Sequence, residues 1–348
     1  MGTQPALNGD KEQVSVLASP LDLRLVGAAL GGSGAGVLDW SSTRRRPLIV
    51  WRFVDGKPGH MQQSHALVRA LARRTLLEVI DVPVQDRRAG VWHWLAGRWK
   101  MTAEREYPLE RPDLLIGAGH RTHMPLLMSR QAFGGKAVVL MKPSLPMGMF
   151  DKVIVPEHDG VTSGGNRILT KGTLNTMRPL RKKPASGILL IGGPGKHFTW
   201  SDDQVMLQAE QVMSMQPEVD WLITDSRRTP AECSSRLALR FGQRFVPHAS
   251  CPQGWLANQL GVSSHAWVTE DSMSMIYESL SAGCDVGLLR LTPSRESRIV
   301  LSTRRLVEDA WVRVLDASGY PTAVRRREPL SEADRIATML LQEWGLTA

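Results

Sequence analysis

The sequence predicts an α/β fold with two doubly wound, Rossmann-like domains that face each other across a cleft. Short apolar runs recur along the 348 residues, alternate with segments of helical spacing, and lead into glycine-rich or polar turns. Parallel strands covered on both faces have this continuous apolar character, and the runs are too many for one modest sheet. We expect strands at 48–53, 113–116, 137–140, 152–155, 188–191, 220–224, 266–269 and 285–289.

Three helices follow from apolar spacing and from capping residues. After the first strand, apolar residues recur at helical intervals, which predicts a helix over 64–77. Ser272 is a preferred N-cap residue and predicts a helix that extends to Ala282. Ser331 predicts the start of an amphipathic helix that continues to Trp344.

The chain divides into an extension and two domains. Residues 1–46 contain the glycine run 31–36, lack a sustained amphipathic period, and do not have the pattern of a signal peptide, so we expect a flexible, poorly structured extension. The basic, proline-containing stretch 172–186 is the natural linker. We therefore expect an N-terminal domain over 47–180 and a C-terminal domain, with the terminal helix, over 181–348.

Composition indicates a soluble globular protein, with 42% hydrophobic and 22% charged residues. No uncharged apolar run reaches the roughly 18–20 residues of a membrane span, which excludes an integral membrane protein. The cysteines Cys233, Cys251 and Cys284 are far apart and form no CxxC. That spacing excludes a disulfide scaffold and the usual zinc sites, and it predicts a cytoplasmic protein.

The net charge of +9 favours anionic partners. Because the positive charge is spread along the chain and no aromatic-basic recognition motif accompanies it, we expect no nucleic-acid partner. The stretch 91–100 holds three tryptophans together with Arg98 and Lys100. This combination predicts an anchor at lipid headgroups and a peripheral position on the inner membrane; the alternative is that the tryptophans pack inside a small helix.

The first candidate site is the turn from Asp55 to His60, directly after the first strand. Its glycines, Gly59 among them, let backbone N–H groups approach a ligand, and the next helix presents its positive end there. Because an unperturbed histidine has a pKa of about 6.5, which suits a general base, His60 is the candidate base, and Asp55 is the alternative. The competing interpretation is a structural turn with an exposed histidine. Further acceptor-side candidates are Lys57, Gly119 and His120.

The second candidate site is the glycine loop that follows the strand at 188–191. It resembles neither a Walker A loop nor a GxGxxG motif, which argues against ordinary dinucleotide binding. A loop of this kind, with a positive residue, suits a phosphate; a plain strand-to-helix turn is the alternative. Its candidate binding residues are Gly192, Gly193, Gly195 and Lys196.

The third candidate site is the helix start at Ser272, Met273 and Ser274. Hydroxyls and free backbone N–H groups in a first helical turn suit a diphosphate. Glu278 lies about one turn beyond Ser274, where its carboxylate can accept hydrogen bonds from ribose hydroxyls. The alternative is a capped amphipathic helix without a ligand. Weaker candidates for phosphate are Arg227 and Arg228. We predict no metal site, because no ligand cluster with metal spacing occurs.

The strings DGKPGH, from Asp55, and TEDSMSMIYESLSAG, from Thr269, resemble the elongated-mitochondria family from about residue 47 to 345. Its plant member is a mitochondrial fission factor. More broadly, the chain is similar to two-domain GT-B glycosyltransferases, above all the peptidoglycan enzyme that adds N-acetylglucosamine to a lipid-linked acceptor. The similarity rests on Gly59-His60, the loop 192–195 and Glu278. Lys57 and Pro58 depart from that enzyme's small residues.

The resemblance implies a metal-independent glycosyltransferase, hexosyltransferase-like, without a tightly bound cofactor. Its donor would be a nucleotide-diphosphate sugar, UDP-linked, and its acceptor a membrane-associated, lipid-linked or lipopolysaccharide-type glycan. Two alternatives stay open: a non-catalytic adaptor that retains the fold, and a sugar-nucleotide epimerase. The donor sugar, the acceptor, the stereochemical outcome and the oligomeric state are open as well.

Overall fold

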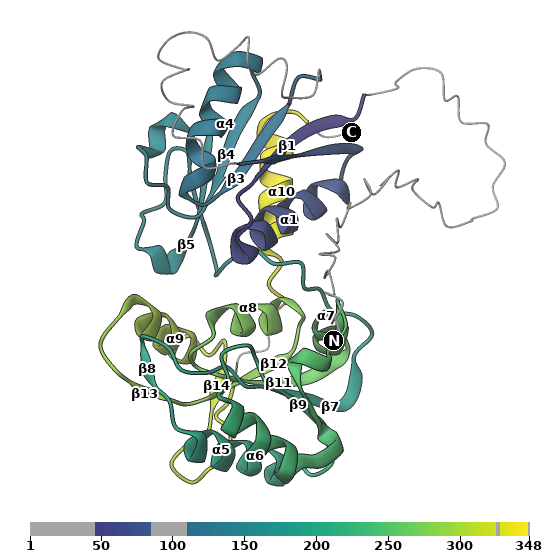
Figure 1. The fold of residues 1–348 in the computed structure, drawn as a ribbon, viewed down its shortest axis with the longest axis vertical. Helices are drawn as coiled ribbons and strands as arrows, with labels where there is room; N and C mark the ends of the chain where they lie inside the picture. Colours follow the sequence, from purple (N-terminus) through teal and green to yellow (C-terminus); the bar gives the residue numbers. More distant parts are fainter. Residues whose placement is uncertain (1–45, 85–109, 325–327, 347–348) are drawn as a thin grey trace, which may run out of the picture. The chain divides into compact units, whose positions relative to one another are not determined.

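The computed structural model describes residues 46–84, 110–324 and 328–346. These residues form two six-stranded sheets, and every strand pair within each sheet is parallel (Figure 1). The α/β prediction is confirmed. The expected extension, apart from Arg46, and the tryptophan-rich stretch 91–100 lie outside the described residues.

The first sheet has the strand order β2-β1-β3-β4-β5-β6. Its helices are α1 (Pro58–Ala72) and α4 (His120–Phe133), with short 3₁₀ turns at Met147–Met149 and Glu157–Asp159. The strands are β1 (Leu48–Val54), β2 (Leu77–Pro83), β3 (Leu114–Ala118), β4 (Lys136–Leu140), β5 (Lys152–Pro156) and β6 (Arg167–Thr170).

The second sheet has the order β10-β9-β7-β11-β12-β14, which is the doubly wound order 3-2-1-4-5-6 when its strands are counted along the chain. Its strands are β7 (Lys183–Leu190), β9 (Asp220–Thr224), β10 (Phe245–Val246), β11 (Ser263–Thr269), β12 (Asp285–Leu289) and β14 (Arg313–Val314); β8 (Phe198–Thr199) and β13 (Thr292–Pro293) form a separate antiparallel pair. Its helices are α5 (Asp202–Met215), α6 (Ala231–Phe241), α7 (Trp255–Val262), α8 (Met273–Ser281) and α9 (Arg298–Glu308), with 3₁₀ turns at Gly242–Arg244 and His248–Ser250.

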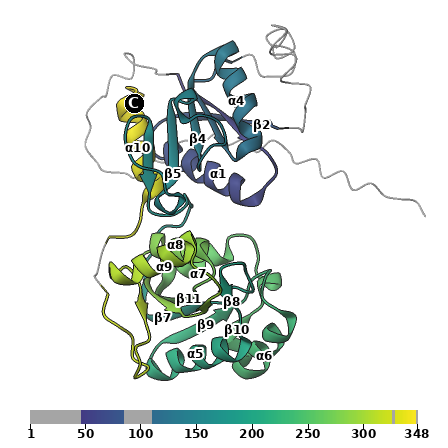
Figure 2. The same cartoon turned by 90° about the vertical axis from the view of Figure 1, so that its left-hand side faces the viewer.

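Each sheet is buried on both faces because its strands are apolar at successive positions. In β3, Leu114 and Ile116 belong to one core cluster and Leu115 to the other. In the second sheet, α5 and α6 cover one face and α7 and α8 the other, as Figures 1 and 2 show. This double cover is what parallel sheets require.

The last helix, α10 (Glu332–Glu343), packs in the core of the first sheet. Ile336, Leu340 and Leu341 share one buried cluster with Leu67 of α1 and Val50 of β1. Figure 2 shows α10 beside α1. The chain therefore returns to its first sheet after completing the second, although its position in the sequence suggested a place in the C-terminal domain.

All eight expected strands are present, but the expected helix over 64–77 is wrong at both ends. The helix α1 begins at Pro58, where the ring fixes a helical φ and the missing N–H belongs to the first turn anyway. It ends at Ala72, and Leu77 begins strand β2. The spacing of apolar residues alone did not show that the helix ends at Ala72 and that a strand begins at Leu77.

Across the described residues, none of the helices is long and apolar enough to traverse a bilayer.

Candidate functional site

Each sheet has a topological switch point, where the chain order of the strands reverses. In the first sheet β1 lies between β2 and β3, and in the second sheet β7 lies between β9 and β11. Ligands of open α/β sheets bind outside the carboxyl ends of the strands at such points. The candidate residues of the sequence follow these strands: Asp55 follows β1, Gly119 follows β3, and Gly192 follows β7.

At the first switch point, His60 is held between Asp55 and Gly119. His60 Nδ1 lies 2.8 Å from Asp55 Oδ2, and the Asp55 side chain is fully buried while that of His60 is 17% exposed. A Cβ on Gly119 would overlap the His60 ring, and Gly119 has a φ of +85°, which favours glycine. Gly119 therefore lets the histidine approach the chain after β3.

The Asp55 carboxylate fixes the chemistry of His60. Burial raises the pKa of Asp55, but hydrogen bonds from His60 and from the backbone N–H of Lys57 outweigh it, so that the pKa lies below its ordinary value. The ionised carboxylate accepts a hydrogen bond from Nδ1 and so favours the tautomer that carries its proton on Nδ1. In that tautomer of the neutral imidazole, Nε2 is an acceptor. An imidazole oriented in this way can remove a proton from a hydroxyl.

The remaining acceptor-side candidates have smaller roles in the geometry. Lys57 is the exposed N-cap residue of α1 and contributes its backbone N–H to Asp55. A Cβ on Gly59 would meet nothing within 4 Å, so that glycine is not required for a close approach. His120 is the exposed first residue of α4.

Sequence analysis missed His123, which is 2% exposed. Its Nδ1 lies 3.3 Å from Ser144 Oγ, and its buried Nε2 has no hydrogen-bond partner among the described residues. Burial, together with the nearby His120 and His60, lowers its pKa to about 4. His123 is therefore neutral near pH 7. Its position one helical turn after His120 was the available signal.

At the second switch point, the glycine loop is packed by the protein's own residues. A Cβ on Gly192 would overlap the Asp271 carboxylate, and a Cβ on Gly193 would overlap the backbone carbonyl of Arg228. Asp271 Oδ2 accepts from Gly193 N at 3.2 Å and from Arg228 Nη2 at 2.6 Å. Gly195 has only an ordinary contact there, and Lys196 is exposed.

The helix α8 begins shortly after the end of β11, the strand that pairs with β7. Gly192 N donates to Thr269 Oγ1 at 2.7 Å, which joins the loops after β7 and β11. Ser272 is the N-cap residue as expected, but its hydroxyl makes no capping hydrogen bond. Met273 and Ser274 follow in the first turn. The backbone N–H groups of this turn thus lack the side-chain cap that the sequence predicted.

Glu278 is buried in α8 and is contacted from the first half of the chain. Gln62 Nε2 on α1 donates to Glu278 Oε1 at 2.9 Å. Burial raises the pKa of Glu278 to about 7, although the hydrogen bond from Gln62 lowers it in part. Sequence analysis missed Gln62, because its contact joins residues far apart in the chain.

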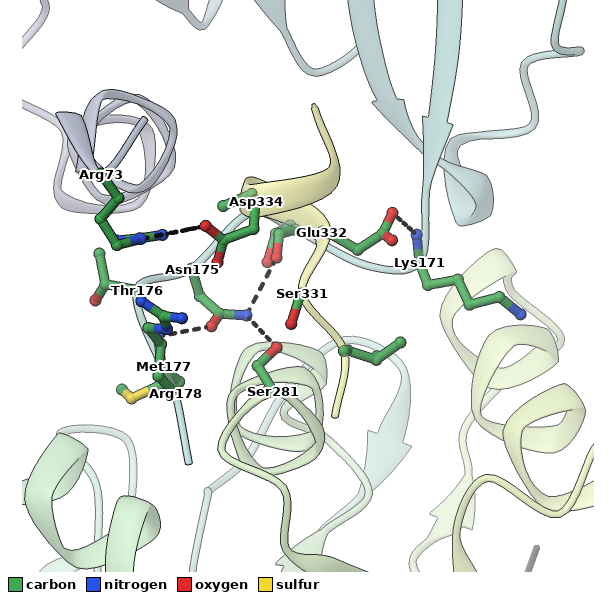
Figure 3. Close-up of a pocket in the computed structure, with 13 residues that line it drawn as sticks. Arg73, Lys171, Asn175, Thr176, Met177, Arg178, Ser281, Ser331, Glu332 and Asp334 are labelled. Carbon is green, nitrogen blue, oxygen red and sulfur yellow. Dashed lines mark hydrogen bonds and ion pairs between the residues drawn. The ribbon is translucent and has the colours of Figure 1, made fainter. Parts of the chain in front are cut away.

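Figure 3 shows a polar cavity away from both switch points, where the linker passes the start of α10. Asn175 Nδ2 donates to Ser281 Oγ, and Asp334 accepts from Arg73. Glu332 accepts from the backbone N–H of Lys171. Since its acidic groups and Asn175 already have partners, this cavity is a structural junction.

Metal ligands do not cluster in the described part of the chain: it contains no group of three or more His, Cys, Asp or Glu residues that is suited to a metal ion.

Comparisons with known proteins give a family and a fold. The family model described as "Mitochondrial fission ELM1" matches residues 58–344, as the motif resemblance predicted. The "Uncharacterized protein RP120" of Rickettsia prowazekii (strain Madrid E) is 22% identical over an alignment 347 residues long with its gaps, and the alignment covers 84% of this chain and 97% of the relative.

Among solved structures, the "putative UDP-N-acetylglucosamine 2-epimerase" from Listeria monocytogenes superposes with a TM-score of 0.53 at 12% identity. The alignment covers 87% of this chain and 98% of that structure. MurG of Acinetobacter baumannii gives a TM-score of 0.42 at 13% identity, with 84% and 91% covered. The first likeness confirms the GT-B-like fold class.

Proposed function

The chain belongs to the mitochondrial fission ELM1 family, and we propose that it is a glycosyltransferase that uses a UDP-linked sugar. The second switch point binds the nucleotide and the first supplies the base. One observation carries this proposal: the hydrogen bond from Gln62 to Glu278. Gln62 lies two residues after His60 on α1, so the same helix that bears the base reaches the carboxylate of the nucleotide site.

The donor side of the proposal uses the loop after β7 and the start of α8. Glu278 accepts hydrogen bonds from the ribose hydroxyls. The Ser272 hydroxyl and the N–H groups of Met273 and Ser274, which no side chain caps, face the diphosphate. Gly192, Gly193, Gly195 and Lys196 complete this side, and the positive helix end with Lys196 stabilises the charge that develops on the departing diphosphate.

On the acceptor side, His60 is the general base and Asp55 its positioning residue. Nε2 of His60 takes the proton of the acceptor hydroxyl as the hydroxyl oxygen attacks the sugar carbon, and the nucleoside diphosphate leaves. Asp55 holds the imidazole in the required tautomer and stabilises the imidazolium that forms. Lys57, Gly59, Gly119 and His120 lie along the acceptor.

We further propose a membrane-associated or lipid-linked glycan as the acceptor, supported by the net charge of +9 and the tryptophan content of the chain. We also propose that the chain forms two domains with a boundary near residue 180, and that α10 belongs to the first of them.

Calorimetric titration of the full chain with UDP, with GDP and CMP as controls, tests the donor assignment. We expect saturable binding of UDP that falls at least about tenfold in Glu278→Ala, because the ribose hydroxyls lose their acceptor. Glu308→Ala, which changes an exposed glutamate on α9, is the matched control and keeps the wild-type affinity. Equal UDP affinity in Glu278→Ala and wild type would contradict the assignment of Glu278.

An adaptor is the second candidate, and a specific observation favours it: Gln62 already occupies one oxygen of Glu278, and the Asp271 carboxylate already lies against the glycine loop. Failure of all three nucleotides to bind supports the adaptor. An epimerase would instead convert a UDP-sugar in the absence of any acceptor, which proton NMR of the sugar detects, whereas a transferase requires the acceptor.

A further inference from the structure

The Asp271 side chain is an anion buried at the second switch point. It is 3% exposed and lies two residues after strand β11. Oδ2 accepts from Gly193 N and from Arg228 Nη2, whereas the buried Oδ1 has no hydrogen-bond partner among the described residues. Burying a carboxylate with an unpaired oxygen is unfavourable, so this arrangement is incompletely satisfied.

The donors that hold Asp271 are those that commonly hold phosphate. A backbone N–H in a glycine loop and a guanidinium both favour anionic oxygens. Because Gly192 has no side chain, the Asp271 carboxylate lies directly against the loop. The structure thus shows that this loop and Arg228 accommodate an anionic group in contact with the backbone.

Arg228 and the residue after it are hydrogen-bonded to the glycine loop. Its Nη1 donates to Gly193 O at 3.0 Å, and Thr229 Oγ1 donates to Gly192 O at 2.5 Å. Ser226 N donates in turn to Thr229 Oγ1. The Arg228 side chain is nevertheless 44% exposed, so an outside ligand can reach it without a rearrangement of the backbone.

The other carboxylates at this edge have partners of their own. Asp225 accepts from His248 N, from His248 Nδ1 and from Ser234 Oγ. Glu270 accepts from Arg290 Nε and from the backbone N–H of Leu291. Asp271 differs from both, because its Oδ1 has no partner among the described residues. An anionic ligand at this loop would therefore compete with Asp271 for Gly193 N and Arg228.

We propose that Arg228 binds the diphosphate of the nucleotide donor by exchanging the Asp271 carboxylate for a phosphate oxygen. This inference rests on the proposed function and adds to it that Asp271 competes with the ligand for Arg228 and Gly193. A diphosphate carries more charge and more acceptor oxygens than a carboxylate, so it can displace Asp271 at the cost of the ion pair with Arg228 and the hydrogen bond from Gly193 N.

Titrations of the full chain with UDP, uridine and inorganic pyrophosphate test the exchange. In Asp271→Asn we expect the affinity for UDP and pyrophosphate to rise about tenfold, because the charged competitor is removed. In Arg228→Ala the affinity for UDP and pyrophosphate falls at least about tenfold. Arg228→Lys keeps the positive charge but loses the bidentate guanidinium, so its affinity lies between those of Arg228→Ala and the wild type. Uridine affinity stays constant in each variant. Arg305→Ala, at an exposed arginine on α9, stays within about twofold of wild type.

Two outcomes overturn the exchange: an unchanged or lower pyrophosphate affinity in Asp271→Asn, including no binding at all, or an unchanged affinity in both Arg228 variants. The proposed function fails separately. If neither UDP nor uridine binds to any variant while Asp271→Asn gains pyrophosphate, the anion exchange stands and the nucleotide assignment does not. Thermal melting of each variant confirms that it is folded.

Discussion

Gln62 of α1 donates a 2.9 Å hydrogen bond to Glu278 of α8, yet the burial of Glu278 still raises its pKa to about 7. One neutral amide therefore offsets only part of the desolvation of this carboxylate. The ionisation of Glu278 then falls in the range of pH in which the protein is handled, and both stability and ligand binding depend on it.

Glu278→Gln will flatten the pH dependence of stability. The ordinary pKa of 4.5 applies in the unfolded chain and about 7 in the folded one. Below pH 4.5 both states are protonated; between 4.5 and 7 only the unfolded state ionises, so the free energy of unfolding falls as pH rises. The variant lacks this loss, so at pH 8 it is more stable by up to about 3 kcal/mol, with little change at pH 4.

Urea unfolding at pH 4, 6 and 8 measures this difference. Glu296→Gln, whose side chain is 65% exposed, is the control and should show the wild-type pH dependence. A parallel loss of stability above pH 5 in wild type and in Glu278→Gln would show that another group causes it.

Asp55→Asn will reduce turnover without weakening nucleotide binding. The amide no longer selects the tautomer that leaves Nε2 of His60 as an acceptor, and it does not stabilise the imidazolium. We expect kcat for sugar transfer to fall about 100-fold or more, the range of general-base catalysis, with UDP affinity unchanged. Asp81→Asn, on the neighbouring strand β2 with a 46% exposed side chain, is the control. A joint loss of kcat and UDP affinity would indicate a structural role for Asp55.

The sequence predicts the strands well because buried parallel strands are continuous apolar runs. The run 188–191 and the glycines after it mark the end of β7 without any tertiary information. The strand β2 escaped prediction because Glu78 and Asp81 interrupt the apolar run of its sequence, LEVIDVP, and because it follows a helix with little separation. Its burial is correspondingly partial, as expected of a strand at the edge of a sheet.

The candidate site was predictable in its position but not in its contacts. Ligand sites at switch points follow from strand order, so the residues after β1 and β7 were found from local patterns. The contacts of Gln62 with Glu278 and of Arg228 with Asp271 join residues 216 and 43 positions apart. Local spacing carries no information on such pairs. The motif resemblance likewise did not indicate that Asp271 would occupy the glycine loop.

Gly119→Ala will displace His60, whereas Gly59→Ala will not. A methyl group at Gly119 overlaps the His60 ring, and the φ of +85° is strained for alanine, which together cost about 1–3 kcal/mol. At Gly59, in the first turn of α1, a methyl group meets nothing and favours the helix by roughly 0.5 kcal/mol. Urea unfolding measures both changes, and displacement of His60 in Gly119→Ala is expected to abolish sugar transfer as well. Equal stability of the two variants would contradict the packing of His60 on Gly119.

Leu340→Ala in α10 will destabilise the core of the first sheet. Leu340 is fully buried in the cluster that contains Leu67 of α1 and Val50 of β1, so the truncation leaves a cavity and costs about 2–5 kcal/mol. Gln342→Ala, an exposed position on the same helix, should change stability by less than about 0.5 kcal/mol. Hydrogen exchange of the β1 backbone amides, followed in urea by mass spectrometry, reports on the first sheet. If α10 were instead an appendage of the second sheet, Leu340→Ala would leave the protection of β1 unchanged, and the return of the chain to its first sheet would have to be abandoned.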